Sequence, residues 1–278
     1  MWIGVTAAEL LGSSRSMTVH SVFASSFNLI ATGTPSVGKP VRAERLLSVS
    51  FGSRLAGCPF GIEIDNPVRA ELGQHWRCDG TTLTAGSATI QLTGLQPDPC
   101  RIEPQRATPD ALSALPDSAA AFANSGLAGL ARPSEILTRL ERVASGLRAG
   151  SDMANDALWL MGRGPGLTPS GDDMLVGMLA AHRACAGGPI HPLLTAATSH
   201  VDAAAESWTA RTTDVGAAYL IQAMRGRFSR PLIALAQALR GTAAETRAAC
   251  TRLRDFGQSS GADTLLGFTV YTHCLPGL

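Results

Sequence analysis

The chain of 278 residues contains a single lysine, Lys39, although lysine and arginine together number 23. A phosphate-binding P-loop requires a Gly-Lys-Ser/Thr sequence, and a Schiff-base enzyme requires a lysine amine in its active site. Lys39 lies in a polar stretch between Gly38 and Pro40, which is typical of a loop. The scarcity of lysine therefore argues against both of these enzyme classes.

Residue pairs with the spacing of metal ligands are missing as well. The six cysteines include no Cys-x-x-Cys pair, and the six histidines include no His-x-x-x-His pair. Such spacings are typical of zinc and iron–sulfur sites. None of the histidines lies beside a Gly-x-Ser-x-Gly elbow, the sequence that marks α/β-hydrolases. We therefore expect free thiols, no metal ion and no cofactor.

Charge is low and balanced, with a formal net charge of +1 and 16% charged residues. This composition favours neither nucleic acid nor an acidic membrane surface as a partner. The first residues, Met1–Val5, lack the basic region and the apolar core of a signal peptide. No run approaches the ~18 apolar residues of a membrane span. We predict a cytoplasmic protein that binds neither nucleic acid nor membrane.

The character of the sequence changes near residue 106. Short β-leaning segments separated by Gly, Pro, Asn and Asp clusters fill the first part: 19–24, 27–31, 45–51, 61–64, 81–84 and 88–92. Helical patterns fill the second part: 109–124, 134–149, 152–161, 172–184, 191–205, 213–224, 230–239, 242–255 and 261–274. We predict an α+β chain with a β-rich domain, 1–106, and a helical domain, 107–278. The β-rich domain is expected to be a small antiparallel sheet or barrel.

One segment of the helical part has an unusual composition. Residues 162–173 read Gly-Arg-Gly-Pro-Gly-Leu-Thr-Pro-Ser-Gly-Asp-Asp and lead into an apolar helical run. Glycine permits positive φ and proline holds φ at about −65°, so this segment has a defined path. It ends at a helix N-terminus, whose N–H groups and dipole favour an anion or a polar small molecule. The candidate substrate-binding residues are Arg163, Gly164, Gly166, Thr168, Ser170 and Gly171.

A shorter echo of this segment occurs 90 positions later. The pattern Ser-Gly-x-Asp-x-Leu-x-Gly at 170–177, the first motif copy, recurs at 260–267, the second motif copy. Two copies predict that two similar helix N-termini face one cleft. A simpler interpretation makes Ser170 and Ser260 N-caps with an acid three residues further on, as in a capping box. The second copy adds three candidate binding residues, Ser259, Ser260 and Gly261.

Three acids are the candidate catalytic residues, as orienting groups or proton acceptors: Asp172, Asp173 and Asp263. Adjacent acids also suit Mg²⁺, and acids in a first helical turn complement the helix dipole.

A third hydroxyl-bearing segment, Arg211-Thr212-Thr213, precedes another helical run. One of its threonines is suited to N-cap that helix, or both hydroxyls line the same cleft. Arg211 and Arg163 are candidate clamps for an anion.

These motifs resemble a known family. Gly-x-Gly-Pro-Gly-Leu-Thr-Pro-Ser-Gly-Asp-Asp, followed by Gly-x-Ser-Ser-Gly-x-Asp at 257–263, is similar to the AllH-like oxamate carbamoyltransferase subunits of allantoin degradation. The resemblance covers most of the chain. It extends to Arg211-Thr212-Thr213, although Gly216 stands where a serine is expected.

The resemblance implies a subunit of a multi-subunit carbamoyltransferase that acts with an acyl-CoA-synthetase-like subunit and a further subunit. The implied reaction is reversible carbamoyl transfer between a small anionic substrate, oxamate by default, and phosphate. Its carbamoyl phosphate would serve a carbamate kinase. The alternative is a non-catalytic subunit that binds a small anion or serves as a scaffold.

Overall fold

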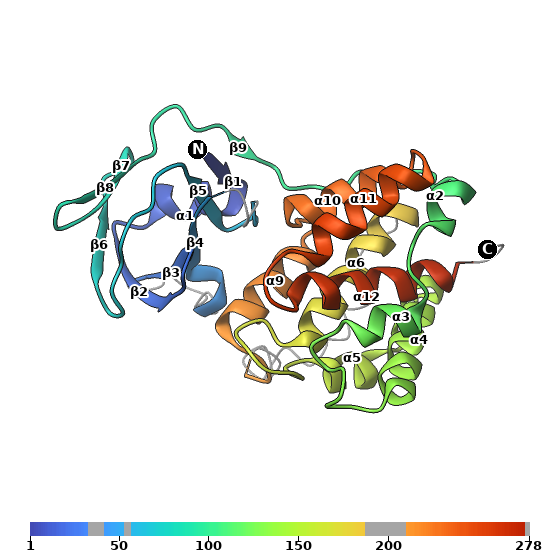
Figure 1. The fold of residues 1–278 in the computed structure, drawn as a ribbon. Coiled ribbons are helices and arrows are strands. Elements are labelled where there is room, and N and C mark those ends of the chain that lie inside the picture. Colours follow the sequence, from blue (N-terminus) through green and yellow to red (C-terminus); the bar gives the residue numbers. More distant parts are fainter. Residues whose placement is uncertain (33–41, 53–56, 187–209, 276–278) are drawn as a thin grey trace. The chain divides into compact units, whose positions relative to one another are not determined.

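The computed structural model describes residues 1–32, 42–52, 57–186 and 210–275. The chain forms two compact units, Met1–Cys100 and Arg101–Leu278 (Figure 1). The first, called the β unit, is a curled sheet, and the second, called the helical unit, consists of packed helices. The predicted α+β class is therefore confirmed. Within the described ranges, no helix has the length and apolar character needed to cross a bilayer.

The described part of the β unit contains a nine-stranded sheet in the order β8-β7-β6-β2-β3-β4-β5-β1-β9. The strands are β1 (Trp2–Gly4), β2 (Ser16–Val22), β3 (Ser26–Ala31), β4 (Leu46–Phe51), β5 (Gly61–Ile64), β6 (His75–Cys78), β7 (Thr82–Ala85), β8 (Ala88–Gln91) and β9 (Pro97–Asp98). Two pairs, β4 with β5 and β1 with β9, run parallel, so the sheet is mixed. Strands β1, β6 and β9 and helix α1 (Val5–Ser13) were not predicted from the sequence.

Alternating burial gives the sheet its core face. Met17 and Val19 on β2 are buried, as are Phe27 and Leu29 on β3, because side chains two residues apart point to the same face. Trp76 on β6 is fully buried against Phe27, with ring centroids 5.5 Å apart. The β unit thus has its own hydrophobic core.

Helices make up the second unit, with α6 and α12 at its centre (Figure 1). They are α2 (Pro109–Ser113), α3 (Ser118–Ala123), α4 (Pro133–Ala149), α5 (Ala154–Leu160), α6 (Ser170–Cys185), α9 (Asp214–Met224), α10 (Arg230–Ala238), α11 (Ala243–Arg254) and α12 (Ser260–His273). The predicted single helix 109–124 is wrong, because Pro116 separates α2 from α3 and proline does not continue a helix. Lys39 and the predicted helix 191–205 lie outside the described residues.

Glycines at matching positions of the two motif copies allow α6 and α12 to cross closely. A Cβ on Gly177 would lie 1.9 Å from the carbonyl oxygen of Thr264. Reciprocally, a Cβ on Gly267 would lie 1.8 Å from the carbonyl oxygen of Met174. Met174 and Thr264 occupy equivalent positions of the motif, as do the two glycines. The copies are therefore related by an approximate two-fold axis through the crossing.

Candidate functional site

Alternating glycines shape the glycine loop, residues 162–169. Gly162, Gly164 and Gly166 have φ values of 72°, 108° and 94°, in the left-handed region that favours glycine. A Cβ on Gly164 would lie 2.8 Å from both the amide nitrogen and the Oγ of Ser170. The loop consequently folds back over the first turn of α6.

The hydroxyls of the two motif copies do not cap their helices. The N-cap positions are Pro169 and Ser259, and neither makes a side-chain capping hydrogen bond. The capping interpretation of Ser170 and Ser260 is therefore wrong, since both are the first residues inside their helices. The Oγ of Ser260 instead lies 2.7 Å from the Oγ1 of Thr168 in the glycine loop. A hydroxyl pair thus joins the second motif copy to the loop of the first.

Asp173 of α6 is buried beside this hydroxyl pair. Burial raises the pKa of its carboxyl well above the ordinary value, and the negative charge of Asp263 raises it further. The nearby hydroxyls of Ser260 and Thr168 act in the opposite direction, because they stabilise the charged form. Burial dominates, so Asp173 retains its proton to a higher pH than an exposed aspartate does.

Asp263 of α12 is held by a segment that the sequence analysis did not single out. The backbone N–H of Gly126 donates to its Oδ1 at 2.9 Å. A Cβ on Gly126 would lie 2.5 Å from the Oγ of Ser170, 2.8 Å from the Oγ of Ser259 and 3.1 Å from the Oδ2 of Asp263. These three oxygen atoms pack so closely against the α-carbon of Gly126 that a larger residue could fit there only if they moved. The signal in the sequence was a further Ser-Gly pair, Ser125-Gly126.

The pKa of Asp263 is also raised. Burial is the main cause, and it is opposed by the Gly126 hydrogen bond and by the neighbouring hydroxyls of Ser170 and Ser259. Asp173 and Asp263, equivalent residues of the motif, therefore form a buried pair of acids in which each raises the cost of charging the other.

Buried oxygen atoms without a partner gather at this place. Among the described residues, the Oγ of Ser125, the Oγ of Ser170, the Oδ2 of Asp173 and the Oδ2 of Asp263 have no partner in strict hydrogen-bonding geometry, although neighbouring hydroxyls lie close enough to stabilise the charged forms of both acids. Ser170 and Asp263 are fully buried. An unsatisfied buried polar group costs about 1–3 kcal/mol, so such groups are rare unless a ligand or water completes them. This gathering of buried oxygen atoms makes the place a candidate binding site for a small polar molecule.

Asp172 links the glycine loop to the segment that precedes α9. Its Oδ1 accepts a hydrogen bond from the N–H of Gly162 at 2.9 Å, and its Oδ2 accepts one from the hydroxyl of Thr212. Burial raises its pKa to about 6, against the effect of these two bonds. A Cβ on Gly216 would lie 2.3 Å from the Oδ2 of Asp172, which explains why glycine occupies this position in place of the expected serine.

Thr213 is the N-cap of α9, as one of the two interpretations of its segment predicted. Its Oγ1 accepts a hydrogen bond from the N–H of Gly216 at 2.9 Å and donates to the carbonyl of Leu167 in the glycine loop. Arg211 is exposed and contributes its backbone, because a Cβ on Gly162 would lie 1.9 Å from the Arg211 carbonyl oxygen. The threonine segment therefore fixes the outer side of the loop.

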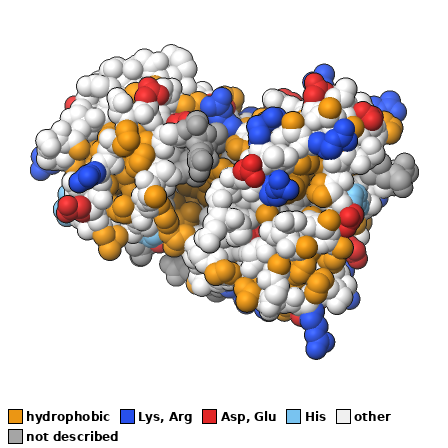
Figure 2. Space-filling model, viewed as in Figure 1, with side chains coloured by type: hydrophobic (Ala, Val, Ile, Leu, Met, Phe, Trp, Pro, Cys, Tyr) orange, Lys and Arg blue, Asp and Glu red, His pale blue; other side chains and the backbone are white. Residues whose placement is uncertain are grey.

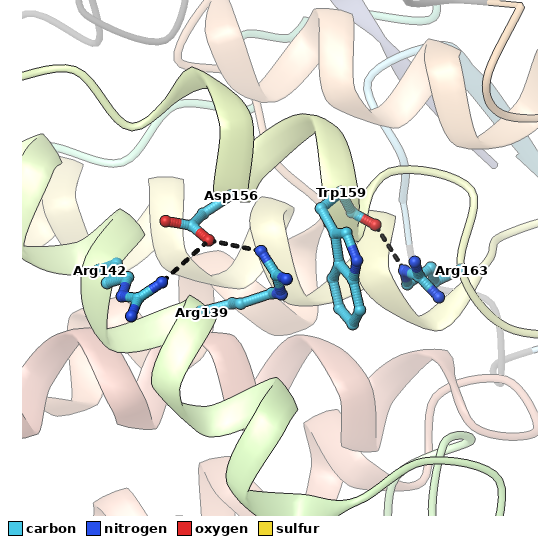
Figure 3. A network of polar contacts seen from close by, with 5 residues as sticks. All are labelled: Arg139, Arg142, Asp156, Trp159 and Arg163. Atoms are coloured by element: carbon cyan, nitrogen blue, oxygen red, sulfur yellow. Dashed lines mark hydrogen bonds and ion pairs between the residues drawn. The ribbon is translucent and has the colours of Figure 1, made fainter.

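Arg163 stacks on Trp159 (Figure 3). Its guanidinium carbon lies 3.4 Å from the centroid of the indole ring, and its Nε donates to the Trp159 carbonyl at 2.7 Å. Arg139 covers the other face at 4.0 Å and pairs with Asp156 at 2.7 Å. Arg142 lies 3.8 Å from the same carboxylate. The side chain of Arg163 thus braces the loop from outside.

The charged side chains on the visible face of the helical unit do not mark a second candidate site. Basic and acidic side chains are interspersed over the visible face of the helical unit (Figure 2). The described residues include no group of three His, Cys, Asp or Glu side chains placed to hold a metal ion. The chemistry of the site is that of hydroxyls, carboxyls and backbone N–H groups.

The structure therefore defines an α+β protein whose helical unit carries a buried serine–aspartate site where the N-termini of two crossing helices meet. Residues 160–272, from the glycine loop through most of α12, match the family described as oxamate carbamoyltransferase subunit AllH. This match confirms the resemblance that the two motifs indicated, over this segment alone. The match does not extend to residues 1–159, so the expectation that the resemblance covers most of the chain is not confirmed. No solved structure matches the chain.

Proposed function

We propose that this chain is a subunit of an oxamate carbamoyltransferase and that its substrate binds where α6 meets α12. The observation that carries the proposal is the convergence of both motif copies on one buried set of oxygen atoms, several of them without a partner. The matched family segment includes both copies, which supports the same assignment.

The reaction we propose is the reversible phosphorolysis of N-carbamoyl oxamate. A phosphate oxygen attacks the carbamoyl carbon, the bond from that carbon to the oxamate nitrogen breaks, and the nitrogen takes a proton. The products are carbamoyl phosphate and oxamate. Negative charge develops on the carbamoyl oxygen in the tetrahedral intermediate, and preorganised N–H and O–H donors stabilise it.

Asp173 is suited to supply the proton to the leaving nitrogen. Burial and the neighbouring Asp263 keep its carboxyl protonated to higher pH than usual, and a protonated carboxyl is able to act as a general acid. The hydroxyls of Ser260 and Thr168 lie beside this carboxyl and are hydrogen-bonded to each other. Phosphate itself is the nucleophile, so the chain needs no nucleophilic side chain.

The proposed setting is a cytoplasmic complex with an acyl-CoA-synthetase-like subunit and a further subunit. The test is to reconstitute this complex and to measure phosphate-dependent release of carbamoyl phosphate from N-carbamoyl oxamate, coupled to ATP formation by a carbamate kinase. Asp173→Asn is expected to lower turnover about 10²- to 10⁴-fold, the usual contribution of a general acid. Glu135→Gln, an exposed first-turn acid of α4, is the matched control.

Two results would contradict the proposal: a correctly assembled complex without carbamoyl transfer, or an Asp173→Asn complex with unchanged turnover. The second result would favour the alternative that this chain binds a small anion or organises the complex without taking part in the chemistry.

A further inference from the structure

The carboxyl of Asp173 is almost closed off from direct contact with a substrate. Asp173 lies in the first turn of α6 and is 5% exposed, and its Oδ2 is buried. The glycine loop folds over the same turn, where a Cβ on Gly164 would lie 2.8 Å from the Oγ of Ser170. A general acid must reach the group that it protonates, either directly or through an intervening group. A proton held by Asp173 therefore needs a path through its neighbours.

The hydroxyls of Ser260 and Thr168 are placed to provide this path. Both lie close enough to the carboxyl of Asp173 to stabilise its charged form, Ser260 more strongly than Thr168. Their oxygen atoms are 2.7 Å apart, within hydrogen-bonding distance of each other. Both residues are half-buried and are thus more accessible than Asp173. Because a hydroxyl accepts one hydrogen bond while it donates another, the three side chains can pass a proton from the buried acid to the glycine loop.

We propose that Thr168 contacts the leaving nitrogen of the substrate and that Ser260 links Thr168 to Asp173 in a proton relay. This inference rests on the proposed function, which supplies the leaving nitrogen. As the bond between the carbamoyl carbon and this nitrogen breaks, Thr168 gives its hydroxyl proton to the nitrogen and takes one from Ser260. Ser260 takes the proton of Asp173, which is left as a carboxylate. The carboxylate regains a proton from the phosphate, which enters as hydrogen phosphate and leaves as part of carbamoyl phosphate.

The relay predicts a specific change in the pH profile when Thr168 loses its hydroxyl. Among the described residues, the charged groups that act on Asp173 are Asp263 of α12 and Asp172 of α6, and both raise its pKa. The hydroxyls lower it, so Thr168→Val is expected to raise the pKa of Asp173 further. The acid works in its protonated form, and the decline of turnover at alkaline pH therefore moves to higher pH. Simple damage to the fold would lower turnover without moving this decline.

The experiment measures kcat for carbamoyl transfer as a function of pH, with the reconstituted complex containing the full chain. Thr168→Val, which keeps the shape of the side chain, and Ser260→Ala are each expected to lower kcat about 10²-fold. Thr168→Ser restores the hydroxyl and is expected to keep kcat within a few-fold of wild type. Combining Thr168→Val with Asp173→Asn is expected to be no slower than Asp173→Asn alone, because groups that act as a unit are not additive. Thr251→Val, which removes an exposed hydroxyl from α11, is the control.

The contact between Thr168 and Asp173 is also measurable without turnover, by urea unfolding of the full chain at a series of pH values. A raised pKa in the folded state makes the free energy of unfolding fall as the pH rises, and Thr168→Val extends this fall to higher pH. The stability difference between Thr168→Val and wild type is therefore expected to grow with pH. A difference that stays constant with pH would overturn the inference.

Three kinetic results would overturn it as well: wild-type kcat in Thr168→Val or Ser260→Ala, a Thr168→Ser variant as slow as Thr168→Val, or additive losses in the combined variant. In a complex that transfers carbamoyl groups, each of these results refutes the relay alone and leaves the proposed function standing. A complex that catalyses no transfer refutes the proposed reaction, and the unfolding experiment then still decides whether Thr168 contacts Asp173.

Discussion

Asp172→Asn is expected to make the folded protein more stable at neutral pH, although the residue lies beside the site. Burial raises the pKa of Asp172 from 3.8 to about 6, so the folded state holds this proton more tightly than the unfolded chain does. Between these two pH values the folded state binds more protons, and its free energy of unfolding therefore falls as the pH rises through that window. Above the window the folded protein carries the full cost of the buried charge.

The size of the effect follows from the shift. A pKa change from 3.8 to about 6 corresponds to about 3 kcal/mol, at about 1.4 kcal/mol per pKa unit. Asparagine can keep both contacts of the carboxylate: its oxygen accepts from the N–H of Gly162, and its nitrogen donates to the hydroxyl of Thr212, which turns to accept. The expected gain is up to about 3 kcal/mol above about pH 7 and close to zero below about pH 4.

Urea unfolding of wild type and Asp172→Asn at a series of pH values measures this difference directly. Subtracting the two curves removes the contributions that the proteins share, and Glu135→Gln controls for the loss of an exposed first-turn acid. A variant that is less stable than wild type at pH 8, or a difference that stays constant with pH, would refute the reasoning. Either result would mean that the charge of Asp172 is better compensated than its burial indicates.

Further variants test the backbone approaches and the loop. Gly177→Ala is expected to lower the free energy of unfolding by at least about 1–3 kcal/mol, because its Cβ would lie 1.9 Å from the carbonyl oxygen of Thr264. Urea unfolding measures the change, and Gly12→Ala, which has open space around its Cβ, is the control. Gly126→Ala is expected to abolish oxamate binding in calorimetry, since its Cβ would lie 2.5 Å from the Oγ of Ser170. Arg163→Ala is expected to leave oxamate affinity within a few-fold of wild type and to speed proteolysis within the glycine loop, because its indole stacking braces the loop from outside.

The glycine loop and the two helix starts were predictable because their signals are local. Alternating glycines indicate positive φ, and the repeated Ser-Gly-x-Asp pattern indicates two similar helix starts within a few residues. The hydrogen bond from Gly126 to Asp263 was not predictable, since it spans 137 residues of sequence and no local pattern reports such a contact. The alternative interpretation of Ser170 and Ser260 as N-caps was wrong, because a capping serine and a serine used for tertiary contacts cannot be told apart from a local pattern.

Strands β1 and β6 were not predicted for a related reason. Strand β1 has three residues and β6 four, too few to display a period of two. Their strand conformation comes from pairing with β5 and β2 across the sheet. The α+β class was predictable because it depends on the average character of long segments, which single short elements hardly change.

The approximate two-fold axis explains why one short motif, used twice, builds one site. In each copy the close-packed glycine follows the first serine by the same number of residues, so both helices begin at the same distance from their crossing. Their first turns therefore meet, and Asp173 and Asp263 become neighbours. The surroundings then break the symmetry: the hydroxyl pair of Thr168 and Ser260 lies beside Asp173, whereas a backbone N–H orients Asp263. Equivalent acids in unequal surroundings differ in the groups that stabilise their charged forms: hydroxyls alone for Asp173, and hydroxyls together with a backbone N–H for Asp263.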